Sequence, residues 1–433
     1  MPRPVRPSTL NPQPSTGMVP WVVLAAAAVL PFHGLALRVG PAGLRPFETS
    51  LLVAVVLALP ALARCWREWL RPRSLDLALG VVVALGLLAL ALHPGPGESL
   101  RTFRLVIVEP ALFYFLASRL LPGRDGALRL AGALIAGGVA ASLLGFGQLV
   151  TGVGTIEAEG VDRIRGPYGS PNNLGLYLDR VAPLALALAL GTASLPGAAA
   201  PSRLLRRALS LAVVVFLAGL ALTYSVGAWL ASGLALAAVL WLSGRRRLLI
   251  GLAGLAAGAA LVIVLLRPER VFSPSTSSIR VLLWDSALRM LRDHPLLGVG
   301  LDNFLYLYSP DLAAEPYMHP DAWREPNLSH PHNLFLDWWL SLGLPGALTL
   351  LWLLRVAARL VARAWAATAG DPLGRALALG LAAGFGAGLL HGLIDNSFFL
   401  PDLAALWWLQ LGLLAELARP APQGHSRAVL AQG

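Results

Sequence analysis

The chain has 433 residues, of which 56% are apolar and only 13% are charged. Soluble globular proteins carry about 25% charged residues, so the composition excludes that class and indicates a protein surrounded mostly by lipid. The formal net charge of +11 arises with no lysine in the sequence, so every basic residue except histidine is arginine. The arginines stand in short groups between apolar runs, a pattern that orients membrane helices and does not favour nucleic-acid binding. A single cysteine, Cys65, excludes an intramolecular disulfide and a cysteine-based metal site.

Apolar runs long enough to cross a membrane, about 20 residues each, recur along the whole sequence. Backbone amides in lipid must be paired internally, so these runs are predicted to be helices. The twelve predicted spans are 20–37, 49–65, 75–93, 103–121, 127–150, 173–195, 208–223, 227–243, 248–266, 344–364, 375–394 and 402–418. Two alternatives stay open: the fourth run contains Glu109 and Pro110, and 208–243 is also compatible with one long helix. The first run lacks a small-residue cleavage site and is expected to be retained rather than removed as a signal peptide.

The arginines also orient the predicted spans. With the N-terminus in the cytoplasm, every cytoplasmic connection is rich in arginine, as the positive-inside rule requires. We therefore predict an all-α, polytopic membrane protein with about twelve transmembrane helices and both ends in the cytoplasm. Its predicted parts are a cytoplasmic segment 1–19, helices within 20–266 that include an outside segment 151–172, a large, partly helical outside loop 267–343, helices within 344–418, and a cytoplasmic tail 419–433.

The loop 267–343 is much longer than the roughly 15 residues of ordinary connections, and such loops are usually functional or disordered. Its aromatic content argues against disorder. A helix is predicted up to Pro295, with Val281, Trp284, Leu288 and Leu291 as an apolar stripe. Arg280 is four residues before Trp284 and shares its face of this helix. Two interpretations are open: the arginine is solvated above the indole, or it is held out to bind a phosphate group with two hydrogen bonds.

A histidine pair, His330 and His332, follows in the same loop. Histidine exchanges a proton near neutral pH, so His332 is a candidate general base. The pair also has a spacing found among metal ligands, but Pro331 disfavours a helix through it and no third clustered ligand is evident, so no metal site is expected. Asp337 lies about 140° around a helix from His332 and is a poor partner for its ring.

Four motifs in the sequence resemble those of the O-antigen ligase and Wzy-type polymerase superfamily of bacterial membrane glycosyltransferases. His332-Asn333 is followed after nine residues by Gly343-Leu344-Pro345-Gly346, similar to the superfamily's H-N-x9-G-x-x-G. The other three are Arg280 to Trp284 followed by His294 to Gly300 (R-x3-W and HP-x-x-G-x-G), Arg165 to Asn173 (R-x-x-G-x-x-x-x-P-N), and His391 to Asp395 (H-x-x-x-D). The resemblance covers nearly the whole chain.

The resemblance implies a metal-independent, inverting transfer of a glycan from an undecaprenyl-diphosphate donor, on the outer side of the plasma membrane and without a cofactor. It implies His332 as the general base and Arg280 as the main catalytic arginine. The residues expected to bind the lipid diphosphate or the glycan are Arg165, Arg163, Arg180, Asn172, Trp284 and Asn333, with His391 as a reserve candidate. The expected partners are the lipid-linked donor, a glycan, lipid or protein acceptor, and the lipid bilayer.

One position departs from the superfamily's pattern. Where its members often have T-x-S-R-G, this chain has Thr223-Tyr224-Ser225-Val226-Gly227, so Val226 occupies the place of an arginine. Arg180, which lies inside a predicted span, is a possible replacement because a membrane-embedded arginine is usually functional or paired. The motifs do not separate a ligase from a polymerase. A secondary transporter is the alternative of another class, since twelve spans fit it, but no internal repeat of the kind found in transporters is evident.

Overall fold

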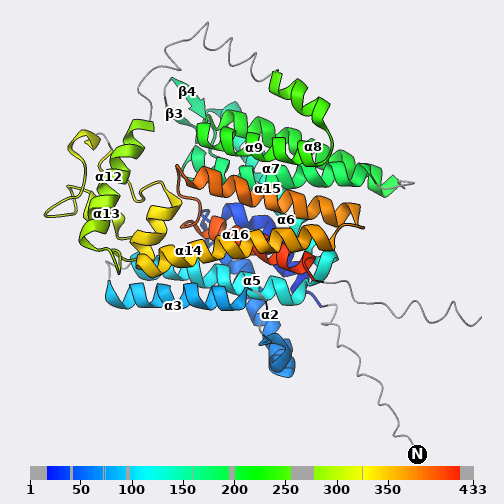
Figure 1. The fold of residues 1–433 in the computed structure, drawn as a ribbon, viewed down its shortest axis with the longest axis horizontal. Coiled ribbons are helices and arrows are strands. Elements are labelled where there is room, and N and C mark those ends of the chain that lie inside the picture. The colour runs from blue at the N-terminus through cyan, green and yellow to red at the C-terminus, as the bar shows by residue number, and fades with distance from the viewer. Residues whose placement is uncertain are drawn as a thin grey trace, which may run out of the picture.

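The computed structural model of the protein describes residues 17–39, 42–71, 73, 75–93, 98–158, 160–194, 200–254, 277–323 and 325–419. Over these residues the chain is mostly helical, and most helices lie side by side in one bundle (Figure 1). The α-helices are α1 (Val19–Val29), α2 (Pro46–Trp69), α3 (Asp76–Leu92), α4 (Glu98–Thr102), α5 (Glu109–Leu120), α6 (Gly123–Thr151), α7 (Pro171–Ala193), α8 (Ala200–Leu222), α9 (Val226–Leu242), α12 (Ser277–Asp293), α13 (Phe304–Tyr308), α14 (Leu334–Ala367), α15 (Pro372–Gly392) and α16 (Pro401–Leu417).

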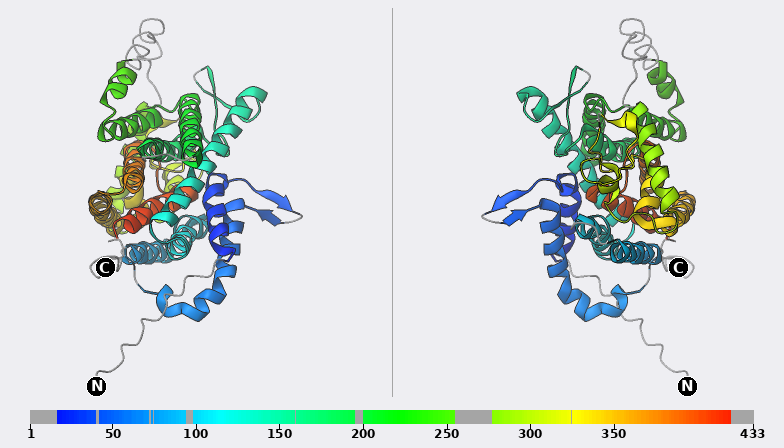
Figure 2. Two further views of the ribbon diagram at one scale, coloured as in Figure 1. Left: turned by 90° about the vertical axis from the view of Figure 1, so that its right-hand side faces the viewer. Right: turned by 90° about the vertical axis from the view of Figure 1, so that its left-hand side faces the viewer.

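Shorter elements connect these helices. Two short 3-10 helices, η1 (Leu30–Phe32) and η3 (Pro320–Ala322), and one π-helical stretch, η2 (Phe103–Val108), are present. Two antiparallel strand pairs also form: β1 (Leu37–Val39) with β2 (Ala42–Leu44), and β3 (Ile156–Ala158) with β4 (Val161–Arg163). Figure 2 shows both hairpins projecting beyond the helices.

Six helices within the described residues are long and apolar enough to cross a membrane. They are α2, α6, α7, Arg203–Leu222 of α8, α14 and α15, and shorter apolar helices cover Val19–Phe32, α3 and α9. These helices are those of a membrane protein, whereas the total of twelve spans stays a prediction. The run 208–243 forms two helices, α8 and α9, rather than one. Of the predicted span 248–266, residues 248–254 are helical and the rest lies outside the described residues.

The termini expected in the cytoplasm are only partly covered. Most of the predicted segment 1–19 and nearly all of the tail 419–433 lie outside the described residues, as do 267–276 of the large outside loop. The run 103–121, which contains Glu109 and Pro110, is helical throughout: η2 passes directly into α5, and Pro110 stands in the first turn of α5. Proline is tolerated there because the amides of a first turn have no partner within their own helix.

Helix α7 packs against α15, α8 and α9 at the centre of the bundle. Glycines spaced four residues apart on α15, Gly380, Gly384 and Gly388, face α7, and a side chain at Gly384 would collide with the backbone oxygen of Arg180. Small residues at this spacing let two helices approach closely in a membrane. Helix α16 is buried along nearly its entire length, so it forms the interior of the bundle.

The outside loop folds into a small helical unit at one end of the bundle, beside the start of α14 (Figure 1). Its core includes Leu283, Ala287 and Met290 of α12, packed with Phe304 and Tyr308 of α13. The predicted stripe on α12 was therefore wrong in part. Val281 and Leu288 are 58% and 55% exposed, because the buried face of α12 follows the residues that meet α13 and α14.

Candidate active site

His332 stands immediately before α14 and is held there by the helix cap. The Asn333 side chain accepts hydrogen bonds from the backbone N–H groups of Phe335 and Leu336, at 3.0 and 3.1 Å, which is the usual role of asparagine at a helix start. Its amide also donates to the backbone oxygen of Leu393, at 2.9 Å. His332 has a φ of 50°, an unusual conformation for a residue other than glycine. The cap thus fixes where the imidazole points.

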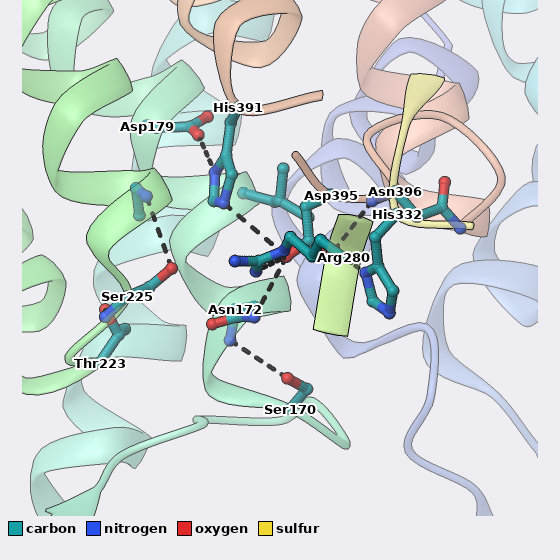
Figure 3. Close-up of polar contacts among 12 residues, drawn as sticks. Ser170, Asn172, Asp179, Thr223, Ser225, Arg280, His332, His391, Asp395 and Asn396 are labelled. Atoms are coloured by element: carbon teal, nitrogen blue, oxygen red, sulfur yellow. Dashed lines mark hydrogen bonds and ion pairs between the residues drawn. The ribbon is translucent and has the colours of Figure 1, made fainter. Parts of the chain in front are cut away.

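Asp395, in the connection between α15 and α16, receives the ring of His332. Its Oδ1 lies 2.7 Å from Nδ1 of His332 and accepts the backbone N–H of Asn396, and its Oδ2 accepts from the amide of Asn172 at 3.1 Å (Figure 3). Nη2 of Arg280 is 3.6 Å from the same Oδ2. Asp395 is only 2% exposed, so four groups from distant parts of the chain meet on one buried carboxylate.

The surroundings of Asp395 keep it ionised. Burial raises the pKa of this carboxyl, but the hydrogen bond from His332 and the positive charges of His332, His391 and Arg280 lower it more, so its pKa lies well below the usual value. An ionised carboxylate only accepts hydrogen bonds, so Nδ1 of His332 carries the proton. Nε2 is then left with a lone pair, and the His332 side chain is 26% exposed. The geometry suits a proton acceptor.

Arg163 and Arg165 are close in sequence but their guanidinium groups bind different partners. Arg163, at the end of β4, donates to the backbone oxygen of Thr223 at 2.8 Å and to the Asn172 side chain at 3.0 Å, so it joins the network around Asp395. Arg165 donates to the backbone oxygens of Gly154, at 2.7 Å, and Tyr168, at 3.3 Å. Arg165 therefore binds within its own loop, while Arg163 reaches the turn that precedes Val226.

Arg180 lies in α7 and is 1% exposed. It donates to the backbone oxygens of Ser397, at 2.6 Å, and Leu176, at 3.3 Å. Ser397 follows Asp395 in the same connection, so Arg180 ties that connection to the central helix. The structure thus places Arg180 behind the carboxylate and not at the exposed side of His332.

His391 lies at the end of α15 and pairs with Asp179 of α7. Both side chains are completely buried, and the second imidazole nitrogen of His391 lies 4.0 Å from Oδ2 of Asp395. Trp284 donates from its indole to the backbone oxygen of His332 at 3.4 Å, so α12 contacts the site through Trp284 as well as Arg280. Both residues extend from the helix on which the sequence predicts them to share a face.

His330 belongs to a separate polar group. Its Nδ1 is 3.4 Å from Oδ2 of Asp337, and both line a small enclosed pocket with Asp302 and Thr102. Burial lowers the pKa of His330, but Asp337 and Asp302 raise it more, so its pKa is above the usual value. The two histidines therefore face different carboxylates. Within the described residues, no group of three or more His, Cys, Asp or Glu side chains is arranged to hold a metal ion.

The two glycine motifs of the outside loop meet through their backbones. Helix α14 is interrupted at Gly343, where φ is 71° and ψ is −174°. The N–H of Leu344 donates to the backbone oxygen of Leu296 at 3.0 Å, and the N–H of Val299 donates to that of Leu340 at 2.7 Å. A side chain at Gly298 would collide with that same Leu340 oxygen. These bonds couple the end of α12 to the helix that carries His332.

The sequence motifs included Asp395 but did not indicate its contact with His332, which lies 63 residues earlier. Asp179 was likewise not predicted as the partner of His391. The available signal was the four-residue spacing of His391 and Asp395 near the end of a span, where polar residues usually face the bundle interior. Of the predicted site residues, the structure joins His332, Arg280, Asn172 and Arg163 around Asp395, with Trp284, Asn333 and His391 adjacent. It sets Arg165 and Arg180 apart.

Residues 211–351 match the protein family described as O-antigen ligase. The matched region runs from within α8 to within α14 and contains Arg280, His332 and the Gly343 interruption. The superfamily resemblance indicated by the sequence motifs is confirmed by this match. Asp395, His391 and Arg163 lie outside it. No curated protein sequence matches the chain.

Proposed function

We propose that this membrane protein of the O-antigen ligase and Wzy-type superfamily transfers a glycan from an undecaprenyl-diphosphate donor to an acceptor hydroxyl. The observation that carries the proposal is the pairing of His332 with Asp395, 2.7 Å apart, beside Arg280. This arrangement supplies a positioned proton acceptor and a cation at one partly exposed place. An acyl or phosphoryl transfer through a protein nucleophile would need a different set of side chains.

His332 acts as the general base in this proposal. The acceptor hydroxyl gives its proton to Nε2 while its oxygen attacks the anomeric carbon of the donor sugar. The bond from that carbon to the diphosphate oxygen breaks, and its electron pair stays on the leaving diphosphate. Asp395 keeps the other ring proton on Nδ1 and stabilises the imidazolium that forms. Proton transfer of this kind contributes about 10²–10⁴-fold to a rate.

The arginines around Asp395 stabilise the charge that develops on the leaving diphosphate. Arg280 is the first candidate because its guanidinium stands 3.6 Å from Asp395 and its side chain is 21% exposed. Arg163 is the second, since it approaches the same network over the turn before Val226. We infer that Arg163 supplies the cation that Val226 does not. Preorganised donors of this kind are often the largest single contribution to catalysis.

The remaining predicted residues have supporting roles. Asn172 holds Arg163 and Asp395 together, Asn333 fixes the ring of His332, and Trp284 secures α12. Arg165 and Arg180 stabilise the two connections from which the site is built. The proposed transfer is metal-independent and inverting, as the resemblance implies, because a single attack by the acceptor inverts the anomeric centre.

We propose the outer side of the bacterial plasma membrane as the location of the site, with both termini in the cytoplasm. The distribution of arginine between the apolar runs supports this orientation. The convergence of His332 and Arg280 on one carboxylate favours an enzyme over a secondary transporter. A Wzy-type polymerase is the remaining alternative within the superfamily. A single lipid-linked donor supplied without another acceptor distinguishes the two, because only a polymerase then yields a ladder of products.

The proposal is tested by His332→Ala in membranes that contain the full chain. Transfer is measured from a lipid-diphosphate-linked oligosaccharide to an acceptor, and the amount of inserted protein is determined in the same membranes. The matched control is His319→Ala, because His319 caps the short helix η3 and does not contact Asp395. We expect His332→Ala to abolish measurable transfer and His319→Ala to retain it. Undiminished transfer by inserted His332→Ala would overturn the assignment of the base.

A further inference from the structure

A cavity of about 210 Å³ lies at the end of the bundle opposite His332. The last turns of α7 and α9, the last turns of α14 and the first turns of α15 line it, and Figure 1 shows this end far from α12 and α13. The same end carries the arginine groups that the positive-inside rule assigns to the cytoplasm. The cavity is therefore separate from the site built around Asp395.

The walls of the cavity combine arginine, hydroxyl groups and apolar side chains. Arg245 and Arg375 line it together with Ser194 and Ser243, and its remaining wall is mostly apolar. Arg245 also borders an adjoining hollow with Arg246 and Arg247. No acidic side chain is among the described residues that line either space. The hollow end of the bundle thus gathers four cations without a carboxylate to balance them.

Two of these arginines lie over tryptophan rings. The guanidinium carbon of Arg375 is 3.7 Å from the ring centroid of Trp365, and that of Arg246 is 4.3 Å from the ring centroid of Trp241. Tryptophan prefers the depth at which membrane headgroups meet the hydrocarbon. A guanidinium stacked on a ring keeps its N–H groups free to donate in its own plane. The stacking therefore presents donors at the level of the headgroups.

The need for membrane orientation alone does not account for this arrangement. A positive-inside arginine can stand on any exposed helix face, as Arg129 on α6 and Arg359 on α14 do. Arg245 and Arg375 instead converge on a concave space, where the electrostatic field of the charges is focused. Arginine binds phosphate oxygens with two parallel hydrogen bonds. Basic pockets between helices on the cytoplasmic side are suited to phosphate headgroups.

We propose that this cavity binds the phosphate of an anionic phospholipid headgroup, with Arg245 and Arg375 as its main donors. The apolar walls, among them Leu190, Leu242 and Leu379, accommodate the start of the acyl chains. A phosphate ester bearing one negative charge matches the two lining cations, and the hydroxyl groups of Ser194 and Ser243 match the polar part of a glycerol headgroup. The site is independent of the glycan transfer proposed above.

The test uses the full chain purified in detergent and titrated with dioleoyl phosphatidylglycerol. Bound lipid is counted by native mass spectrometry, with dioleoyl phosphatidylcholine as the zwitterionic reference. An arginine near a headgroup contributes about 1 kcal/mol, so removing two weakens binding about thirtyfold. We expect Arg245→Gln/Arg375→Gln to lose its preference for phosphatidylglycerol by about that factor. The matched control, Arg129→Gln/Arg359→Gln, removes the same charge outside the cavity and should retain the preference.

Three results would overturn the proposal. They are an unchanged lipid preference in the double variant, an equal loss in the control variant, and no preference for phosphatidylglycerol in the unaltered protein. Arg245→Gln alone guards against misfolding, because Arg245 is exposed, and it should lose about fivefold. Inorganic phosphate is the final probe: if millimolar phosphate displaces the lipid, the ligand is a free anion and the assignment to a lipid fails.

Discussion

His391 and Asp179 form a buried pair directly behind the carboxylate that holds His332. Nδ1 of His391 lies 2.7 Å from Oδ2 of Asp179, and its Nε2 lies 4.0 Å from Oδ2 of Asp395. Nε2 has no hydrogen-bond partner among the described residues and is shielded from solvent. Two histidine–carboxylate pairs therefore stand in series, and Asp395 is common to both.

Asp395→Asn should lower the rate of glycan transfer by about 10²-fold or more, with little change in membrane insertion. The amide can still accept a hydrogen bond from His332, but it cannot offset the charge of the imidazolium that forms during proton abstraction. His332 should also become less basic, so the acidic limb of the pH–rate profile should move to lower pH. Initial rates across pH check both effects. Asp337→Asn is the control, since Asp337 pairs with His330. A rate within threefold of the unaltered protein would refute the role of Asp395.

His391→Gln should reduce transfer by about tenfold, less than the loss from His332→Ala, because His391 acts only through Asp395. Asp179→Asn should cause a similar loss, and the double variant should be no worse than either single one. Transfer rates in a double-mutant cycle measure this coupling. Gly227→Ala is a second probe, since its added carbon would lie 2.7 Å from the ring of His391. Fully additive losses would show that the two residues act separately.

Much of the site could be predicted because its motifs are local. Asn333 caps α14 and Gly343 interrupts it, and both functions depend on a fixed spacing along one helix. Asp395 could not be assigned to His332 in this way, because their contact depends on how α15 ends beside α14. The partner of Arg280 is likewise set by the packing of α12 and not by its helical face.

The two arginines of the first outside segment show another limit. Arg163 and Arg165 have equivalent claims in the sequence. In the structure the backbone turns after β4, where the side chain of Gln148 accepts from the N–H groups of Arg165 and Gly166, at 3.2 and 2.9 Å. That turn directs Arg165 into its own loop. Tertiary hydrogen bonds of this kind have no periodic signature, so the sequence pattern does not reveal them.

Arg163→Gln should raise the KM for the lipid-linked donor by about tenfold or more, because a hydrogen bond to a charged phosphate contributes about 1.5–3 kcal/mol. Arg165→Gln should mainly lower the unfolding temperature, since its partners are the backbone oxygens of Gly154 and Tyr168. Donor titrations and thermal unfolding of the two purified variants separate these effects. The opposite assignment of KM and stability would contradict the proposed role of Arg163.

The stability of the outside loop should decrease as pH rises past neutrality. The pKa of His330 is raised in the folded protein above its ordinary value of 6.5. A raised pKa gives stability that is complete below the unfolded pKa and is lost as pH rises through the folded pKa. Burial also raises the pKa of Asp302, which acts in the same direction at lower pH. Thermal unfolding between about pH 5.5 and 8.5 tests this, and the slope in the upper half of that range should be smaller in His330→Asn. An equal slope in both proteins would exclude His330 as its source.

Gly343→Ala should lower the stability of the protein by about 1–3 kcal/mol, the usual cost of forcing a side chain into such a backbone conformation. Its φ is 71°, and the added carbon would lie 2.5 Å from the backbone oxygen of Leu296. Relief of this collision moves the first part of α14 and with it His332, so transfer should fall as well. Gly386→Ala is the matched control, because nothing lies within 4 Å of the added carbon and the site is within α15. Alanine there should leave the unfolding temperature unchanged or slightly raised. Equal unfolding temperatures for the two variants would mean that the hydrogen bonds between Leu296 and Leu344 do not hold the break in place.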